Sequence, residues 1–240
     1  MNAQDPHSTF VVAIDGPSGT GKSSTAKELS RSLGIDYLDT GAMYRALTWA
    51  ALRDGIDLAD PDAIAEVAST ADLTFSTDPD EAQISVDGLD VSRAIREEAV
   101  TSVVSTIAAE PRARAVLVER QRRAVTRACE DGGIVVEGRD IGSVVLPDAD
   151  LKIWLVADPE VRAARRAAED AAAGRLAHAH GPGAVDTVAQ DLARRDAADA
   201  TRRASPTTRA DDAVIVDATD LSLAEVIDHV VGLVRARDGA

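Results

Sequence analysis

The chain has 240 residues, of which 45% are hydrophobic and 28% charged, and its formal net charge is −15. These values are typical of a soluble globular protein that can bury a full core, and no apolar run approaches the roughly 20 residues that span a bilayer. The negative charge argues against nucleic acid or an anionic membrane as a partner, because both require a basic surface. A lone Cys129 excludes an intramolecular disulfide, and the start of the chain lacks a secretory signal, so we expect a cytoplasmic protein.

Short apolar and β-branched runs predict strands at 9–14, 37–38, 134–136, 151–156 and 213–216. Helix-length stretches separate most of these runs, which is typical of βαβ units and a parallel sheet. The sequence therefore predicts an α/β fold around one core.

A glycine-rich motif follows the first predicted strand and precedes a helical stretch. GPSGTGKS, residues 16–23, fits the pattern G-x-x-x-x-G-K-[ST], whose backbone N–H groups and helix N-terminus bind phosphate. Lys22 is placed to reach the β- and γ-phosphates of a nucleotide, and the Ser23 hydroxyl is placed to bind Mg²⁺. We predict an ATP site formed by Gly16, Pro17, Ser18, Gly19, Thr20, Gly21, Lys22, Ser23 and Ser24.

Two stretches interrupt the alternation of strands and helices. Residues 73–92 hold two short alternating runs with turn-rich connections, which predicts a small antiparallel insertion. Residues 167–186 are rich in alanine and glycine and only weakly apolar, and we interpret them as an irregular flap between helices. Both stretches are expected to be appendages of the core.

A second motif, GIVVEGRDIG, ends its predicted strand at Glu137 and continues with Arg139 and Asp140. In a doubly wound sheet this end lies beside the phosphate-binding loop, so these side chains are expected to contact an anionic second substrate and to support metal chemistry. A structural ion pair of Arg139 with Asp140 or another neighbour is the alternative. The chain has no Asn-Lys-x-Asp sequence, which argues against a regulatory GTPase.

Arginine dominates the positive charge, because only three of the 26 basic residues are lysines. The arginines cluster in EPRARAVLVERQRR, DPEVRAARR and LARRDAADATRR. The planar guanidinium suits phosphate and carboxylate, although any single arginine can equally lie on a solvated helix face. Around Arg114, we interpret Arg112, Arg120, Arg122 and Arg123 as solvated.

Seven segments, taken in their order along the chain, resemble segments of the bacterial cytidylate kinases, which belong to the nucleoside-monophosphate kinases. They are IDGPSGTGKSS, YLDTGAMYRALTW, VDGLDVSRAIR, AAEPRARAVLVERQR, VVEGRDIGSVVLPDADLKIWL, DPEVRAARR and RRDAADATRRASP, and they span about residues 11–219. The resemblance implies a P-loop core with a central parallel sheet, a small mixed α/β nucleotide-monophosphate insert and a helical lid. The expected bounds are 9–59, 111–159 and 206–240 for the core, 60–110 for the insert and 160–205 for the lid, after a disordered N-terminus at 1–8.

The same resemblance implies roles for individual residues. Lys22 and Arg139 would be catalytic, and Arg162, Arg165 and Arg166 would stabilise the transferring phosphoryl group. The CMP site would be formed by Thr40, Arg45, Ser105, Arg114, Arg139, Asp140, Arg195, Asp199 and Arg202. Two positions depart from the family pattern, since many relatives have Ser at position 40 and Leu after Pro206, where this chain has Thr207.

The implied reaction is phosphoryl transfer from ATP to CMP or dCMP, with Mg²⁺ bound to ATP. We expect a monomer without nucleic-acid or membrane partners. Another acceptor, such as UMP, AMP or shikimate, is the first alternative. A non-catalytic P-loop module that reports nucleotide binding to a partner is the second.

Overall fold

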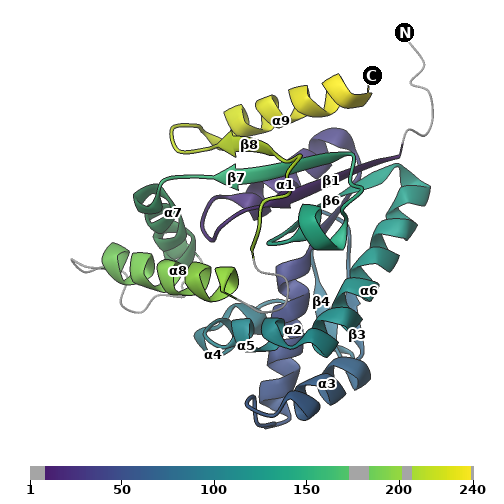
Figure 1. The fold of residues 1–240 in the computed structure, drawn as a ribbon, viewed down its shortest axis with the longest axis vertical. Helices are drawn as coiled ribbons and strands as arrows, with labels where there is room; N and C mark the ends of the chain where they lie inside the picture. The colour runs from purple at the N-terminus through teal and green to yellow at the C-terminus, as the bar shows by residue number, and fades with distance from the viewer. Residues whose placement is uncertain (1–8, 173–183, 202–206, 239–240) are drawn as a thin grey trace.

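The computed structural model describes residues 9–172, 184–201 and 207–238 (Figure 1). The N-terminal residues 1–8, which we expected to be disordered, and the predicted site residue Arg202 lie outside this part of the chain.

A five-stranded parallel sheet forms the centre of the fold, in the order β2-β6-β1-β7-β8. Its strands are β1 (Phe10–Asp15), β2 (Asp36–Asp39), β6 (Gly133–Gly138), β7 (Leu151–Val156) and β8 (Val214–Asp217). The predicted strands and the α/β class are confirmed: β7 has the predicted bounds, and the ends of the other four strands differ from the prediction by one or two residues.

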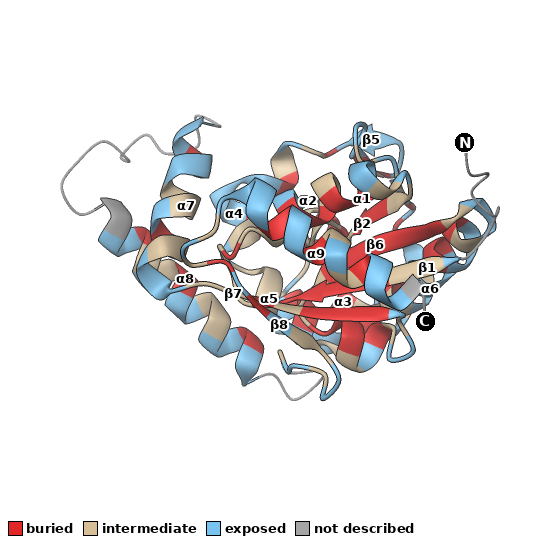
Figure 2. Ribbon diagram, turned by 90° about the horizontal axis from the view of Figure 1, so that it is seen from above, coloured by how far each residue is buried: buried red, intermediate tan, exposed pale blue. Residues whose placement is uncertain are grey.

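Helices cover both faces of this sheet, which explains why its central strands read as continuous apolar runs. Val12 and Ile14 pack against α1 (Lys22–Leu33) and α9 (Leu223–Asp238), whereas Ala13 between them belongs to the cluster formed with α2 (Thr40–Arg53) and α6 (Pro111–Ala128). Figure 2 shows the buried strands between helices that are exposed on their outer sides.

The predicted antiparallel insertion is confirmed as a three-stranded sheet of β3 (Leu73–Phe75), β4 (Ile84–Val86) and β5 (Leu89–Asp90). The turn between β4 and β5 has positive φ at Asp87 (51°) and Gly88 (76°), as a tight hairpin requires. Helices flank this sheet: α3 (Pro61–Thr70), the short 3₁₀ turn η1 (Ala94–Arg96), α4 (Glu98–Thr101) and α5 (Val104–Ala109).

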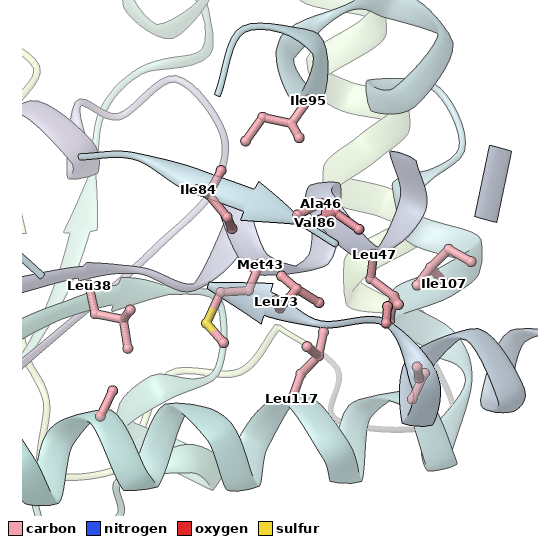
Figure 3. Packing of buried hydrophobic residues seen from close by; sticks show 14 of the residues in the cluster. Leu38, Met43, Ala46, Leu47, Leu73, Ile84, Val86, Ile95, Ile107 and Leu117 are labelled. Carbon is pink, nitrogen blue, oxygen red and sulfur yellow. The ribbon is translucent and has the colours of Figure 1, made fainter. Parts of the chain in front are cut away.

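The insert shares one hydrophobic cluster with the core. Figure 3 shows Leu73 and Ile84 of the small sheet around Met43 of α2, with Leu117 of α6 beside them. This packing fixes the insert against the two helices that cover one face of the main sheet. The bounds of core, insert and lid as separate domains stay a prediction.

Two helices, α7 (Pro159–Ala172) and α8 (Ala184–Ala200), pack together through Ala163, Val188 and Leu192. They correct our interpretation of residues 167–186 as an irregular flap, since 167–172 continue α7 and 184–186 belong to α8. Alanine has the highest helix propensity, and it outweighs the weak apolar pattern here. The residues between these helices lie outside the described chain.

Two short turns follow α6. The 3₁₀ turn η2 (Cys129–Asp131) leads into β6, and the π-helical turn η3 (Ile141–Val145) follows Arg139 and Asp140. No local pattern in the sequence predicts η3.

Candidate active site

The phosphate-binding loop connects β1 to α1, as predicted. Gly16 has φ of 150°, and a Cβ atom there would lie 2.1 Å from the carbonyl oxygen of Leu155, so only glycine fits this approach to β7. Thr20 Oγ1 and Lys22 Nζ donate to the Pro17 carbonyl oxygen at 3.1 and 2.7 Å. The ammonium group of Lys22 therefore lies against its own loop.

A cavity of about 230 Å³ opens beside this loop, where β6 ends. Six arginines and Lys22 line it, against four carboxylates, although the whole chain has a net charge of −15. Positive side chains are therefore concentrated at one place in an acidic protein. The charged and hydroxyl side chains of the lining are Ser18, Lys22, Ser23, Asp39, Thr40, Tyr44, Arg45, Arg96, Thr101, Ser105, Arg114, Glu137, Arg139, Asp140, Arg166, Arg195 and Asp199.

Glu137, the carboxylate at the end of β6, lies next to the phosphate-binding loop. Its two oxygens accept hydrogen bonds from Ser23 Oγ at 2.9 Å and from the Tyr37 hydroxyl. Burial, together with the charge of Asp39, raises the pKa of Glu137 to about 7. Removal from water and the charge of Arg139 lower the pKa of Lys22, also to about 7. A bound cation would therefore stabilise the charged form of Glu137, and a bound anion would stabilise the charged form of Lys22.

The N-terminus of α2 places a second group of charges in the cavity. Asp39 caps the helix by accepting from the Ala42 N–H at 2.8 Å, and it also pairs with Arg45 at 2.9 Å. Burial acts to raise the pKa of Asp39, but Arg45 and Arg96 outweigh it and hold that pKa below its usual value. This end of the cavity presents two arginines that share one carboxylate.

The lining of the cavity also includes a buried ion pair between Arg114 of α6 and Asp140, each only 4% exposed. The Arg114 guanidinium lies 5.5 Å from the centre of the Tyr44 ring. Thr40 donates from its hydroxyl to the Glu137 carbonyl oxygen at 2.7 Å. Such a buried charged pair costs desolvation energy, and its polar atoms face a cavity in which a ligand can bind.

The α8 helix reaches the phosphate-binding loop through Asp196. This carboxylate accepts hydrogen bonds from the Ser18 N–H at 3.0 Å, from Arg139 at 3.2 Å and from Arg162 at 2.5 Å. Arg139 also lies 3.4 Å from Asp199 and donates to the Gly16 carbonyl oxygen and to Ser18 Oγ. Arg139 therefore contacts both the loop and α8.

Most predicted site residues meet in the cavity. Those that line it are Ser18, Gly19, Lys22, Ser23, Thr40, Arg45, Ser105, Arg114, Arg139, Asp140, Arg166, Arg195 and Asp199. The alternative of an ion pair between Arg139 and another neighbour is met in the structure, because Arg139 pairs with Asp196 and Asp199, whereas Asp140 pairs with Arg114. Asp199 lies 3.3 Å from Ser105, and Arg195 lies 3.4 Å from Thr101.

Two of the three predicted lid arginines lie outside the lining. Arg162 donates to the Ser18 carbonyl oxygen at 3.0 Å, and Arg165 donates to the carbonyl oxygens of Ala218 and Leu221 at 2.7 and 3.2 Å. Arg166 alone of the three lines the cavity, and it also pairs with Asp170, one turn further along α7, at 3.0 Å.

Sequence reasoning assigned no role to Asp39, Arg96, Thr101 or Asp196. Arg96 and Thr101 reach the cavity because η1 and α4 pack against α2, a tertiary contact that no local sequence pattern predicts. Asp39 carried a signal, since it precedes Thr40 at a predicted strand-to-helix junction, where N-caps occur.

The donors near the loop fit a hard divalent cation. Mg²⁺ in phosphate sites is held by one or two protein oxygens together with the substrate phosphates, and Ser23 Oγ and Glu137 supply a hydroxyl and a carboxylate side by side. Within the described residues, no group of three or more His, Cys, Asp or Glu side chains could hold a metal ion by itself.

None of the described helices is long and apolar enough to cross a membrane.

The chain is similar in sequence to known proteins over nearly its whole length. The family model described as cytidylate kinase matches residues 12–236. A cytidylate kinase of Streptomyces avermitilis is 52% identical over 230 residues, covering 96% of this chain and 94% of the relative. A cytidylate kinase of Rhodococcus opacus is 51% identical over 232 residues, covering 97% of each. Among solved structures, a shikimate kinase from Acinetobacter baumannii in complex with shikimate has a TM-score of 0.42 at 12% identity, covering 95% of this chain and 94% of that one.

Proposed function

The chain belongs to the cytidylate kinase family, and we propose which of its residues carry out that family's reaction. The enzyme transfers the γ-phosphoryl group of ATP to CMP or dCMP. A phosphate oxygen of the acceptor forms a bond to the γ-phosphorus, the bond from that phosphorus to the β–γ bridging oxygen breaks, and ADP leaves with CDP or dCDP. Phosphoryl transfer of this kind depends on alignment and on compensation of charge. One observation supports this assignment above the others: a single cavity is lined both by the phosphate-binding loop and by the buried pair of Arg114 and Asp140.

The donor site is the loop of residues 16–24. Its backbone N–H groups and the N-terminus of α1 bind the phosphates of ATP, and Lys22 leaves the Pro17 carbonyl to contact the transferring group. Ser23 and Glu137 would hold Mg²⁺, which supplies compensation for the negative charge of the triphosphate when it is bound. Burial and Asp39 raise the pKa of Glu137, and a Mg²⁺ ion that arrives with ATP would favour its charged form.

The acceptor phosphate binds between Arg45, Arg96 and Arg139. These three arginines line the cavity from α2, from the insert and from the end of β6, and each is near a carboxylate, Asp39 or Asp199, that an incoming phosphate can replace in part. Guanidinium groups suit this exchange because they bind carboxylate and phosphate in the same planar mode.

The sugar and the base occupy the rest of the acceptor site. Asp199 accepts a ribose hydroxyl beside Ser105 and Arg195, and the assignment of Arg202 to the same region rests on the family pattern alone. Asp140 accepts a hydrogen bond from the exocyclic amine of cytosine, Arg114 faces the base carbonyl, and Thr40 supports the same edge. Uracil has a carbonyl oxygen where cytosine has the amine, so it would leave the Asp140 carboxylate opposite an acceptor.

The lid arginines divide between two tasks. Arg166 faces the cavity and stabilises the transferring phosphoryl group. Arg162 and Arg165, which bond to backbone carbonyls around the loop, hold α7 on the donor site and reach the phosphoryl group only if α7 moves when substrates bind.

We further propose that the enzyme works as a cytoplasmic monomer without a nucleic-acid partner. Residues of one chain provide both the donor and the acceptor groups of the cavity, and the net charge of −15 disfavours polyanions. Light scattering during turnover tests the oligomeric state, and a stable dimer would contradict it.

ADP release across a panel of acceptors tests the function. CMP and dCMP should be phosphorylated well, while UMP, AMP and shikimate should be poor. Leaving a buried acceptor unpaired costs roughly 1–3 kcal/mol, so kcat/KM for CMP should exceed that for UMP by about tenfold to a hundredfold. Asp140→Asn should narrow this gap, chiefly by harming CMP. Equal use of CMP and UMP by the wild type, or an unchanged ratio in Asp140→Asn, would contradict the assignment of Asp140, and a better rate with AMP or shikimate would contradict the function.

A further inference from the structure

The π-helical turn η3 fixes the backbone that carries Asp140. The Asp140 carbonyl oxygen accepts hydrogen bonds from the N–H groups of Val144 at 2.9 Å and Val145 at 3.1 Å, which closes the turn back onto Asp140. Turns of this kind are rare and are frequent at functional sites. The position of the Asp140 carboxylate therefore depends on how firmly Val144 and Val145 are held.

Arg122 of α6 holds those same two residues from the other side. Its Nε donates to the Val145 carbonyl oxygen at 2.8 Å, and its terminal nitrogen donates to the Val144 carbonyl oxygen at 3.0 Å. The planar guanidinium fork matches two adjacent carbonyl oxygens. The peptide group between Val144 and Val145 therefore accepts from Arg122 through its carbonyl oxygen and donates from its N–H to the Asp140 carbonyl oxygen. Hydrogen bonds in such chains strengthen one another.

The same helix contacts Asp140 a second time. Arg114 pairs with the Asp140 carboxylate, and Arg122 lies eight residues further along the same side of α6. One rigid helix thereby fixes both the side chain and, through η3, the backbone of Asp140.

The other arginines of this helix have different partners. Arg123, the next residue, pairs with Glu119 on an exposed surface where both side chains are more than 60% exposed. Arg112 pairs with Glu110 and Asp62. Arg122 is exposed to solvent, as we interpreted it, but no local sequence pattern predicts that it donates to two backbone carbonyl oxygens of η3.

We propose that Arg122 is a positioning residue for recognition of the acceptor base. It acts through η3 to hold Asp140 where the exocyclic amine of cytosine binds, and it contacts neither substrate. This inference rests on the proposed function, since it presumes that Asp140 reads the base.

The test compares Arg122→Ala with Arg123→Ala. Both changes remove one positive charge from adjacent, exposed positions of one helix, but only the first releases η3. In Arg122→Ala we expect kcat/KM for CMP to fall by about tenfold, because a small misplacement of a binding group is costly in a preorganised site. The KM for CMP should rise while the KM for ATP stays the same, and the preference for CMP over UMP should shrink. Arg123→Ala should match the wild type in all of these values, and Arg122→Lys, which can still donate to one carbonyl, should recover part of the loss.

Each outcome separates the inference from the proposed function. If the wild type prefers CMP and Arg122→Ala behaves like Arg123→Ala, the positioning role of Arg122 is wrong while the function stands. A loss in Arg122→Ala that affects the KM values for ATP and CMP alike, with an unchanged CMP-to-UMP ratio, also overturns it, because that is the signature of a general loss of structure. If the wild type does not phosphorylate CMP, the proposed function fails.

Discussion

Asp15, the last residue of β1, is 4% exposed and connects the phosphate-binding loop to the turn that follows Asp140. Its two carboxylate oxygens accept hydrogen bonds from the N–H groups of Ile141 at 2.8 Å and Gly142 at 2.7 Å, at the start of η3. Since Gly16 follows it directly, this one residue ties the beginning of the phosphate-binding loop to the turn behind Asp140. Burial raises its pKa to about 6, and the two backbone hydrogen bonds oppose but do not cancel that effect.

The raised pKa of Asp15 predicts how stability depends on pH. Below the ordinary value of 3.8, Asp15 is protonated in both the folded and the unfolded protein. As the pH rises toward 6, the unfolded chain loses this proton before the folded protein does, so the free energy of unfolding falls. Between pH 4 and 7, the contribution of Asp15 to the free energy of unfolding should fall by on the order of 3 kcal/mol, from about two pKa units at 1.36 kcal/mol each.

Asp15→Asn removes this titration, so urea unfolding of the variant should depend less on pH than that of the wild type. The variant also loses one of the two acceptors, which shifts its stability at every pH but does not change the slope. Asp211→Asn, at an exposed position, is the matched control and should keep the slope of the wild type. Parallel curves for the wild type and Asp15→Asn would show that the Asp15 proton is not linked to folding.

At the scale of elements, α8 places the carboxylate of Asp196 against the phosphate-binding loop. The Asp196 carboxylate binds the loop N–H of Ser18 together with Arg139 and Arg162, a set of donors that also suits a phosphate group. Burial acts to raise the pKa of Asp196, but the hydrogen bonds from Ser18 and Arg162 outweigh it, so the group is charged at neutral pH. Bound ATP and this carboxylate therefore compete for the same donors.

We expect Asp196→Asn to bind ATP more tightly when no acceptor is present. The neutral amide keeps the size of the side chain but loses its charge-assisted contacts. Each such contact is worth roughly 1.5–3 kcal/mol when buried and less at this partly exposed position. The Kd for ATP, measured by calorimetry, should fall about fivefold, which corresponds to about 1 kcal/mol. Asp191→Asn is the control on the same helix, since Asp191 pairs with Arg194 at an exposed position. Weaker ATP binding in Asp196→Asn would mean instead that Asp196 orients Arg139 and Arg162 for the nucleotide.

Some elements could be predicted from the sequence and others could not. The strands and the phosphate-binding loop were predictable because their signals are local: apolar runs for β1 and β7, and glycine spacing before Lys22. The turn η3 was not predictable, because IGSVV has no local turn signal and takes its shape from Asp15 and Arg122, which lie far away in the chain. Arg122 and Arg123 show the same limit, since identical neighbouring residues have different roles that only tertiary contacts decide.

At the scale of the whole molecule, the cavity is formed by three parts that the chain order keeps apart. The phosphate-binding loop follows β1, Arg96 and Ser105 come from η1 and α5, and Arg166, Arg195 and Asp199 come from α7 and α8. These parts meet over the carboxyl ends of β1 and β6, where ligands bind in doubly wound sheets (Figure 1). An acceptor that contacts all three parts would hold them together over the γ-phosphate and exclude water.

This arrangement predicts that ATP hydrolysis depends on the acceptor. Without CMP, the acceptor-site arginines stay paired with carboxylates such as Asp39 and Asp199, and nothing draws the insert and α8 together, so water is a poorly placed nucleophile. ADP release from ATP alone should be at least about 100-fold slower than with saturating CMP, because closure that needs both substrates prevents wasteful hydrolysis. Lys22→Met should lower both rates by about 100-fold or more, which would identify the same loop as the source of both activities. If ATP is consumed at the same rate with and without CMP, the acceptor is not what completes the site, and the insert and the lid do not control access of water to the γ-phosphate.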